Sequence, residues 1–399
     1  CWHYLFNIFL QCCKTFLKIN LMSDHLQYKP VPESGILDDW LISANGLTNK
    51  ILKSLAPGSE RIAIQDIVNP PHWEFGHITW FHEFWVHRHG QTTLPSLLSN
   101  SDYLFNSSNI AHENRWSVEI PSLDVLIAYN AQVIEQTREL LTKQINVQTA
   151  YFLQLSIFHQ DMHNEAFAYM WQTLGYPEPF KPFSDPSFSN QLPSSFIQFE
   201  ESTMTVGAAP NSGFIFDNEK WAHAVSLPAF AISNQPVTNV QYLEFIESSA
   251  NQSHLNPIPY PIHWKKDGGT WYQRYFNAWL VFRPDEPVRH ISYLNAKRYC
   301  QWRKLRLPTE HELALLRNQS ATQWQSSYLW EWTDSVFQPF PGFVSDPYTD
   351  YSSPWFDDNY QVLKGWSMYT PERLKRKNFR NFYAPHRSDL FCGFRTCMP

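Results

Sequence analysis

The stretch NVQTAYFLQLSIFHQDMHNEAFAYMWQTLGY, residues 146–176, organises the first half of the chain, because its apolar side chains recur at helical spacing. We predict one long helix that ends near Gly175, since Pro177 cannot continue it. Within this helix His159 and His163 stand one turn apart on the same face. Two imidazoles at this spacing can grip one metal ion, but a third ligand is then needed.

Three further segments of the first half show helical periodicity. The residues are 37–55 (LDDWLISANGLTNKILKSL), 69–90 (NPPHWEFGHITWFHEFWVHRHG) and 121–143 (PSLDVLIAYNAQVIEQTRELLTK), the last with Ser122 as its expected N-cap. Four helices are the count of a small bundle. A Pro- and Ser-rich stretch, 177–196, then indicates a linker.

After the linker the pattern changes to short β-like runs with many turn signals. Two short helices are expected there, TNVQYLEFIES and TEHELALL. Each begins with a capping box, Thr238 with Gln241 and Thr309 with Glu312, in which side chain and backbone satisfy each other's free donors. The second half is therefore predicted to be a mixed domain of strands and short helices.

Composition limits the class of protein. A chain of 399 residues exceeds the size at which one core usually keeps growing, so two domains are expected. Its 43% hydrophobic and 16% aromatic content argues against disorder and for aromatic-lined pockets. The net charge of −6 gives no reason to expect nucleic-acid or membrane-surface binding. The six cysteines form no disulfide framework, which favours a reduced, cytoplasmic protein.

Residues 1–21 precede the first methionine, Met22. Their apolar run is broken by Asn7, Gln11 and Lys14, so it is too short to span a bilayer. We expect these residues to belong to an over-extended reading frame and exclude them from the fold prediction.

The third metal ligand is expected from the segment 69–90, where five histidines are candidates: His72, His77, His82, His87 and His89. Trp73, Trp80, Phe81 and Phe84 form its apolar stripe, and His77 falls in the middle of that stripe, whereas His82 and His87 lie off it.

The stripe of a bundle helix faces inward, so His77 is the histidine that can meet the pair. Glu165 lies on another face and is expected behind the ligands or at the surface. Three buried imidazoles without a carboxylate suit zinc, copper or iron.

These motifs resemble a known family. HWEFGHITWFHEFWV followed by HQDMHNEAF is similar to the DinB-like bundle of iron-dependent sulfoxide synthases that act on hercynine, the trimethylated betaine of histidine. PVRHISYLNAKRYCQWRKLRLPTEHELALL, YLWEWTDS and FRNFYAPHRSDLFCGFRTC resemble the formylglycine-generating-enzyme (sulfatase-modifying-factor) fold, which is C-type-lectin-like. The resemblance implies an α+β protein: a DinB-like four-helix bundle over 22–176, then a lectin-like domain over 197–399.

The resemblance also implies a reaction. His77, His159 and His163 would hold Fe(II), with the remaining coordination positions open to substrate and O2. The family joins sulfur to an imidazole carbon of hercynine and oxidises it to a sulfoxide. In PFPGFVSDPYTDY the family places a catalytic tyrosine, which we assign to Tyr348, with Tyr351 as the competitor.

Substrate contacts are implied in two further segments. FRNFYAP, residues 379–385, matches the segment that lines the betaine pocket, so Asn381, Phe382 and Tyr383 are candidates, the two rings for cation–π contact. Trp332 is another candidate ring, but core packing is the favoured role for it. Arg115 lies where relatives bring an arginine to the donor substrate, although a solvated charge at a helix start is the simpler expectation.

Two departures concern the donor. Typical members have a polar residue where this chain has Met162, and a Trp-Asp pair where it has Phe382 and Tyr383. HQDMHNEAFAYMWQTLGYPEP and RSDLFCGFRTC resemble more closely the selenoneine branch, which couples hercynine to a selenosugar. The alternative is ergothioneine-type synthesis with cysteine or γ-glutamylcysteine.

Two other functions compete with this interpretation. A copper-type formylglycine-generating oxidase is prompted by the pair Cys392 and Cys397, although the pair is placed differently from that family's metal-binding cysteines. A non-catalytic protein that binds a betaine or a sugar is the third possibility, and the intact histidine set argues against it.

Overall fold

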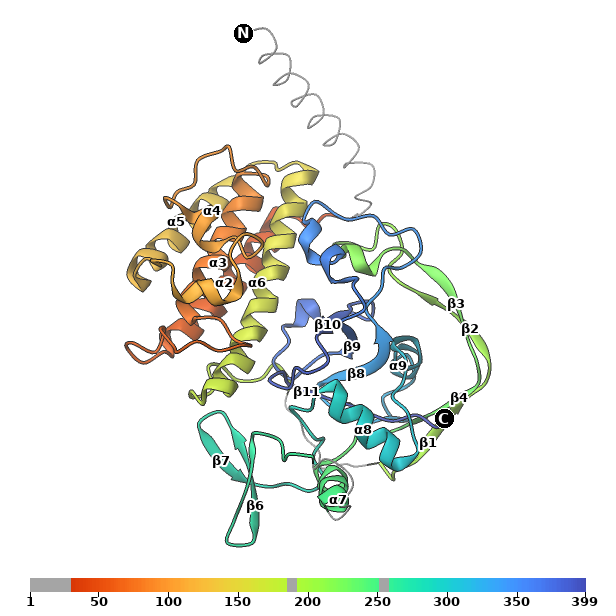
Figure 1. The fold of residues 1–399 in the computed structure, drawn as a ribbon. Coiled ribbons are helices and arrows are strands. Elements are labelled where there is room, and N and C mark those ends of the chain that lie inside the picture. Colours follow the sequence, from red (N-terminus) through yellow and green to blue (C-terminus); the bar gives the residue numbers. More distant parts are fainter. Residues whose placement is uncertain (1–29, 185–191, 251–257) are drawn as a thin grey trace.

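The computed structural model describes residues 30–184, 192–250 and 258–399 (Figure 1). The residues that we assigned to an over-extended reading frame lie outside these ranges, as does part of the expected linker. Among the described residues, the regular elements before residue 175 are helices, and every strand comes after residue 195. The protein therefore mixes helix and sheet, in the order that the sequence predicts.

All four predicted helices of the first half form. They are α2 (Ser34–Lys53), α3 (Pro71–His82), α5 (Leu123–Leu141) and α6 (Val147–Leu174). Ser122 accepts a hydrogen bond from the Val125 backbone N–H at 3.5 Å and caps α5 as expected. Helix α6 ends at Gly175, whose φ of 72° is a left-handed conformation that suits glycine. That this bundle is DinB-like stays a prediction.

Helix α3 is buried on every side, because it packs against α4 (Ser101–Phe105), α5 and α6. It continues as a π-helical turn, η1 (Glu83–His87), and a 3-10 helix, η2 (His112–Trp116), follows later in the chain. A helix without an exposed face belongs to the core, so its polar side chains need partners inside the protein.

Helix α6 joins the two halves of the molecule (Figure 1). Its Glu165 accepts hydrogen bonds at 2.8 Å from the Trp330 indole, 2.5 Å from Ser367 and 2.8 Å from Thr370, all in the second half. Our expectation that Glu165 lies at the surface or behind the metal ligands was wrong, because this buried carboxylate binds the bundle to the second half.

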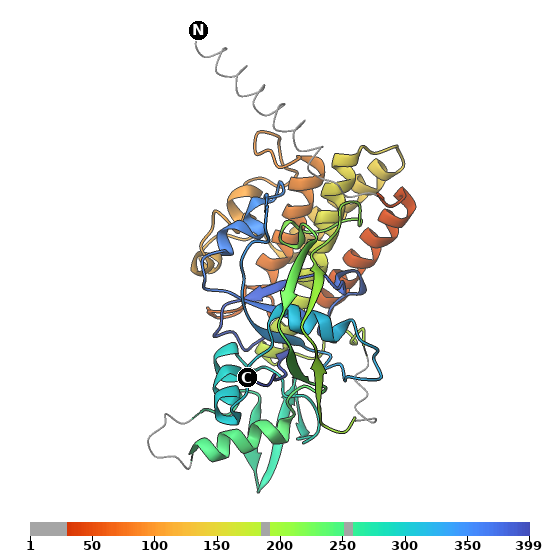
Figure 2. The same ribbon diagram turned by 90° about the vertical axis from the view of Figure 1, so that its right-hand side faces the viewer.

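The described part of the second half holds four small sheets. Strand β1 (Phe196–Phe199) pairs with β4 (Phe230–Ser233), and β2 (Ser202–Val206) with β3 (His223–Leu227), both antiparallel. The antiparallel strands β5 (Trp264–Asp267), β6 (Thr270–Tyr275) and β7 (Ala278–Val281) form a third sheet. Both views place β6 at the end of the molecule away from α3 (Figure 1, Figure 2).

The fourth sheet has the order β10-β9-β8-β11. Its strands are β8 (Trp330–Val336), β9 (Gln361–Gly365), β10 (Asn381–Tyr383) and β11 (Cys392–Gly393), and only the β8–β11 pairing is parallel. Trp332 of β8 is fully buried and donates to the Ile291 carbonyl at 2.7 Å. It belongs to the core, as we favoured.

The α-helices described in this half are α7 (Asn239–Ala250), α8 (Tyr293–Arg303) and α9 (Glu310–Arg317). The predicted capping box of Thr309 and Glu312 is complete at the start of α9. At α7 the Gln241 side chain accepts from the Thr238 backbone N–H at 3.0 Å, which is one half of the predicted box. Among the helices of the described residues, none combines the length and apolarity that a bilayer crossing requires.

Candidate metal centre

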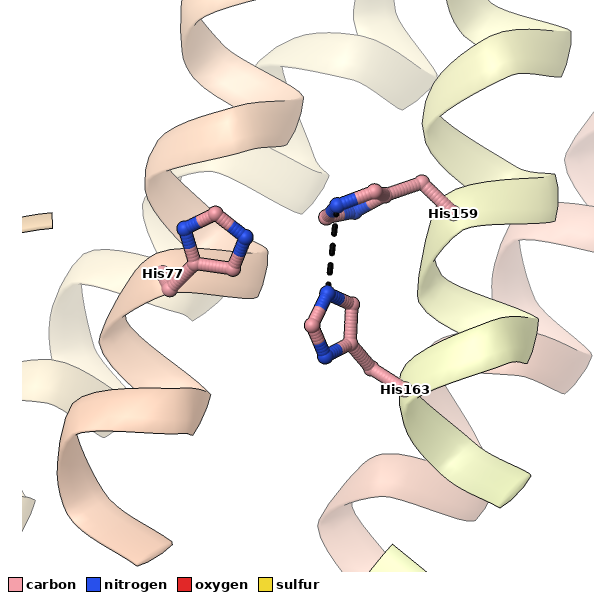
Figure 3. A group of neighbouring side chains, drawn as sticks. All are labelled: His77, His159 and His163. Carbon is pink, nitrogen blue, oxygen red and sulfur yellow. Dashed lines mark hydrogen bonds between the residues drawn. The ribbon is translucent and has the colours of Figure 1, made fainter. Parts of the chain in front are cut away.

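Three histidines meet between α3 and α6 (Figure 3). His77 comes from α3, and His159 and His163 come from successive turns of α6. One nitrogen of each ring lies within 4.8 Å of the others, and the Nε2 atoms of His159 and His163 are 3.1 Å apart. Imidazole nitrogens that bind one ion at about 2.1 Å lie roughly 3 Å apart when they occupy neighbouring positions. The spacing of His159 and His163 therefore fits a shared ion, and a His77 nitrogen lies within 4.8 Å of both.

Hydrogen bonds outside the cluster orient two of the rings. His77 Nδ1 lies 2.7 Å from the Phe105 carbonyl, which can only accept, so Nδ1 carries the proton. His163 Nδ1 donates in the same way to a carboxylate oxygen of Glu74 at 2.5 Å. Both rings are left with an unprotonated Nε2 for a ligand. A carboxylate or carbonyl behind a histidine is the usual arrangement around protein-bound metals.

Burial keeps the imidazoles of His77 and His159 neutral. It lowers the pKa of His77 to about 3, with the neighbouring His163 adding to the effect. Burial also holds the pKa of His159 well below its ordinary value. Burial alone would raise the pKa of Glu74, but His163, His77 and Asn69 favour its anion and lower the pKa to about 2. Neutral imidazoles backed by an anion are the form in which histidine binds a metal.

A polar chain extends from Glu74 to Arg115. The other Glu74 oxygen accepts from the Asn69 amide at 2.6 Å, and the Asn69 carbonyl oxygen accepts from Arg115 Nη1 at 2.6 Å. The guanidinium stacks on Trp73 at 4.1 Å, and Arg115 Nε is buried without a hydrogen-bond partner. Arg115 is therefore half-buried and not the freely solvated charge that we favoured, because the Trp73 ring and Asn69 hold its guanidinium.

Aromatic side chains surround the histidines. Phe81 stacks on His159 with ring centroids 3.6 Å apart, and Trp73 stacks on His77 at 5.1 Å. A cavity of about 50 Å³ is lined by His77, Phe81 and Tyr348, among others. These walls leave a small space beside His77, and the His163 side chain is 19% exposed.

The two tyrosine candidates differ in what they face. The Tyr348 ring lies 5.0 Å from Phe81 and 6.3 Å from His159, and burial raises its pKa. Tyr351 instead stacks on Phe216 at 4.3 Å and donates to the Met162 sulfur at 3.7 Å. The structure thus brings Tyr348 to the wall of the histidine cavity.

The loop that carries these tyrosines is pinned from both ends. Before Tyr348, Asp346 accepts from Lys220 Nζ at 2.5 Å and from the Tyr151 hydroxyl at 3.1 Å. After it, the Ser352 hydroxyl donates to Asp217 at 2.5 Å. Buried polar partners on each side fix the position of the loop relative to the centre.

Strand β10 separates the three substrate-binding candidates, because successive side chains point to opposite faces. Tyr383 reaches α6, where its hydroxyl lies 3.3 Å from that of Tyr169. Asn381 shares its face of the strand. Phe382 stacks on Phe337 at 3.8 Å within the second half. The structure does not bring Phe382 together with the histidines.

Sequence reasoning missed Glu74, Asn69 and Tyr169. Glu74 offered one signal, since it stands three residues before His77, nearly one helical turn away. Asn69 lies before α3, so only the folded chain shows that it touches Glu74.

The remaining histidines of this segment lie elsewhere. His82 and His87 both approach the Thr137 hydroxyl of α5, with Nε2–Oγ1 distances of 3.2 and 2.8 Å. His72 donates to the Glu60 carbonyl at 2.7 Å.

Known proteins resemble both halves. Residues 187–329 match the sulfatase-modifying factor enzyme 1-like domain, which confirms that part of the predicted fold. The chain is 27% identical over 392 residues to hercynine oxygenase of Mycobacterium tuberculosis, with 82% of this chain and 91% of that protein covered. Hercynine oxygenase of Mycolicibacterium smegmatis is 26% identical over 397 residues with the same coverage.

A third relative aligns over a smaller part of both chains. Ergothioneine biosynthesis protein 1 of Schizosaccharomyces pombe is 28% identical over 217 residues, which are 46% of this chain and 27% of that protein. The similarity to hercynine oxygenases thus spans both the histidine-bearing helices and the strand-rich half.

Proposed function

We propose that this protein is a non-haem iron enzyme that uses O2 to attach selenium, or alternatively sulfur, to the imidazole of hercynine. The observation that carries the proposal is the convergence of His77, His159 and His163. It occurs in a chain of which 82% aligns with a hercynine oxygenase.

The donor set fits Fe(II). Three neutral imidazoles and no carboxylate leave the ion its full positive charge, and three ligands leave further positions open. Bound iron would activate O2 beside the donor and the imidazole ring. The residues around it hold the geometry: Glu74 and the Phe105 carbonyl fix two rings, and Phe81 fixes the third by stacking.

Tyr348 is proposed as the proton source of the reaction. Burial raises the pKa of its phenol, so the hydroxyl stays protonated at neutral pH. It lines the same cavity as His77, within reach of a small molecule bound there. A positioned phenol can deliver its proton as charge develops on a neighbouring oxygen.

We propose that hercynine and its donor lie between α6 and β10, where Tyr383 reaches α6 and Asn381 shares its side of the strand, with Arg115 on the α3 side of the centre. The Tyr383–Tyr169 hydroxyl pair offers neutral donors and acceptors. A sugar presents hydroxyl groups that such phenols can bind, whereas the ammonium group of cysteine prefers a carboxylate. This composition favours the selenosugar.

A thiol donor is the second candidate, because the relatives are named for hercynine oxidation and ergothioneine biosynthesis. In that case Arg115, with its free buried Nε, would receive the carboxylate of cysteine or γ-glutamylcysteine.

One competition separates the candidates. The purified protein is incubated with Fe(II), O2 and hercynine in the presence of cysteine, γ-glutamylcysteine and a selenosugar, and the products are identified by mass spectrometry. We expect the selenium adduct of hercynine. If only a sulfur adduct forms, the donor substrate is the thiol and not the selenosugar.

Metal analysis of the same protein tests the wider proposal. Stoichiometric iron after anaerobic purification is the expected result. Copper would favour the formylglycine-generating oxidase, and absence of both metals together with absence of any product would remove the enzymatic proposal altogether.

A further inference from the structure

A second cavity lies in the strand-rich half, apart from the histidines. It has a volume of about 230 Å³ and is bounded by β2, α9 and the end of β9. None of the three clustered histidines lines it. Sites for drug-sized ligands typically measure roughly 300–1,000 Å³, so this cavity suits a smaller molecule.

Arg317, the last residue of α9, lines this cavity without a counter-ion. Its guanidinium lies over Trp366 at 4.1 Å and over Trp324 at 5.3 Å, and among the described residues it makes no hydrogen bond or ion pair. Gly365 leaves room for this guanidinium, because a Cβ at that position would stand 3.1 Å from Arg317 Nη1. The φ of +98° at Gly365 also favours glycine. The chain thus holds this guanidinium by its faces and leaves its N–H edge free.

Lys364, on β9, is the second unpaired cation. It is only 5% exposed, and Nζ donates to the backbone carbonyls of Lys377 at 3.0 Å and Phe379 at 2.7 Å. An ammonium group has three donors, so one remains after these two bonds. Burial lowers the pKa of Lys364 to about 8, which leaves the amine mostly charged at neutral pH.

The nearest carboxylates are already engaged with other arginines. Glu310, which acts on Lys364, binds Arg380 through two bonds of 2.9 Å. Glu331, which acts on Arg317, binds Arg395 through bonds of 2.5 and 2.8 Å. Each carboxylate thus neutralises one of the two cations near it and leaves the other without a counter-ion. Lys364 is buried and Arg317 is partly buried. Charge that is removed from water without a counter-ion is costly, so this excess favours an anion.

A third cation, Arg376, lines the cavity. Arg376 adds positive charge to the wall, but its Nη2 donates to Glu219 at 2.6 Å and its Nη1 donates to the Phe214 carbonyl. Free N–H groups therefore come from Arg317 of α9 and Lys364 of β9. Donors that approach from two elements can each bind a different oxygen of one anion.

We propose that this cavity binds a tetrahedral oxyanion of the phosphate class between Lys364 and Arg317. The site is independent of the reaction proposed above. The cavity size admits either inorganic phosphate or the phosphate group of a small molecule.

The test is calorimetric titration of the full chain with inorganic phosphate and with glycerol phosphate at constant ionic strength. Saturable binding is expected, weakened about tenfold in Arg317→Gln, because one charged hydrogen bond contributes roughly 1.5 kcal/mol or more. Arg303→Gln is the matched control: Arg303 also ends a helix and stacks on a tryptophan, Trp302 at 5.5 Å, but it does not line the cavity.

Tighter binding of glycerol phosphate would identify the ligand as a phosphomonoester, and equal binding would identify free phosphate. Absence of saturation, or equal weakening in both variants, would overturn the proposal. Should Arg317→Gln fail to fold, a structure of the unaltered protein with inorganic phosphate decides: density between Lys364 Nζ and Arg317 is expected, and density only elsewhere contradicts the site.

Discussion

Helix α3 and its π-helical continuation carry histidines of two clusters, which differ in how their ring nitrogens are used. On one face His77 meets His159 and His163, and partners behind His77 and His163 hold their protons at Nδ1. On another face His82 and His87 direct Nε2 to the Thr137 hydroxyl, which itself donates to the Val133 carbonyl at 2.8 Å. That hydroxyl therefore accepts from the rings.

Both clusters are largely buried, so burial alone does not distinguish a metal centre from a core contact. The difference lies in where the unprotonated nitrogens point. In the first cluster they converge, and in the second the corresponding nitrogens are already used as donors to a side chain. Hydrogen bonds outside a cluster thus decide whether it is available to an ion.

The largest difference between the two clusters is expected when a metal ligand is removed. We expect His77→Ala to lose iron and activity, because two imidazoles cannot hold the ion alone. His82→Ala, the matched change on the other face, should keep stoichiometric iron. Metal analysis of the two purified variants, with circular dichroism to confirm folding, is the measurement. Iron loss in His82→Ala with retention in His77→Ala would reverse the assignment of the two clusters.

Tyr348 packs beside the first histidine cluster and not beside the second. Its substitution is expected to give the next largest effect. Tyr348→Phe keeps the ring contact with Phe81 but removes the hydroxyl. If the phenol supplies a proton, kcat should fall roughly a hundredfold or more while iron content stays unchanged. Tyr351→Phe, whose hydroxyl faces Met162, is the control. A larger loss in that variant would move the proton source to Tyr351.

Glu74 tests the bond behind His163. Glu74→Gln keeps the size of the side chain but removes its charge, so His163 loses an anionic partner. Iron affinity is expected to fall about 10-fold to 100-fold, as for other partners behind metal ligands. Competition with a chelator measures it. Unchanged affinity would mean that Glu74 only fills space.

The second cluster, His82 and His87, is expected to affect the stability of the protein at acidic pH. Burial lowers the pKa of His82 to about 3, below the ordinary 6.5, so the unfolded chain takes up the proton first. The stability from neutral His82 is full above pH 6.5 and is lost as pH falls toward 3. Between pH 6.5 and 5 this amounts to about 2 kcal/mol.

Urea unfolding of His82→Gln at pH 7.5 and pH 5 measures this term. The variant should lose less of its free energy of unfolding on acidification than the unaltered protein, because glutamine does not titrate. Equal losses would place the acid sensitivity in other groups.

Thr137 gives the smallest expected effect. Thr137→Val removes the acceptor that His82 and His87 share, with little change in shape. A cost of about 1 kcal/mol in unfolding free energy is expected, with iron content unaffected. Denaturant unfolding and metal analysis check the two parts, and iron loss would show that the clusters are coupled through α3.

Periodicity, capping residues and the position of His77 in an apolar stripe could be read from the chain because they are local. Helix α6 ends at Gly175 and α9 begins with its capping box for reasons contained in a few neighbouring residues. The same local reasoning misplaced Glu165 and Arg115. Their partners, Trp330 for the one and Asn69 for the other, come from distant segments.

The sequence by itself determined which side chains share a helix face, because a fixed rise and turn per residue sets that relation. It thereby selected His77, His159 and His163 before any coordinates. Only the tertiary structure decided which nitrogen of each ring is free, which tyrosine reaches the centre and where Arg317 and Lys364 are left without counter-ions. Those outcomes depend on contacts between segments far apart in the chain, and no local pattern specifies such contacts.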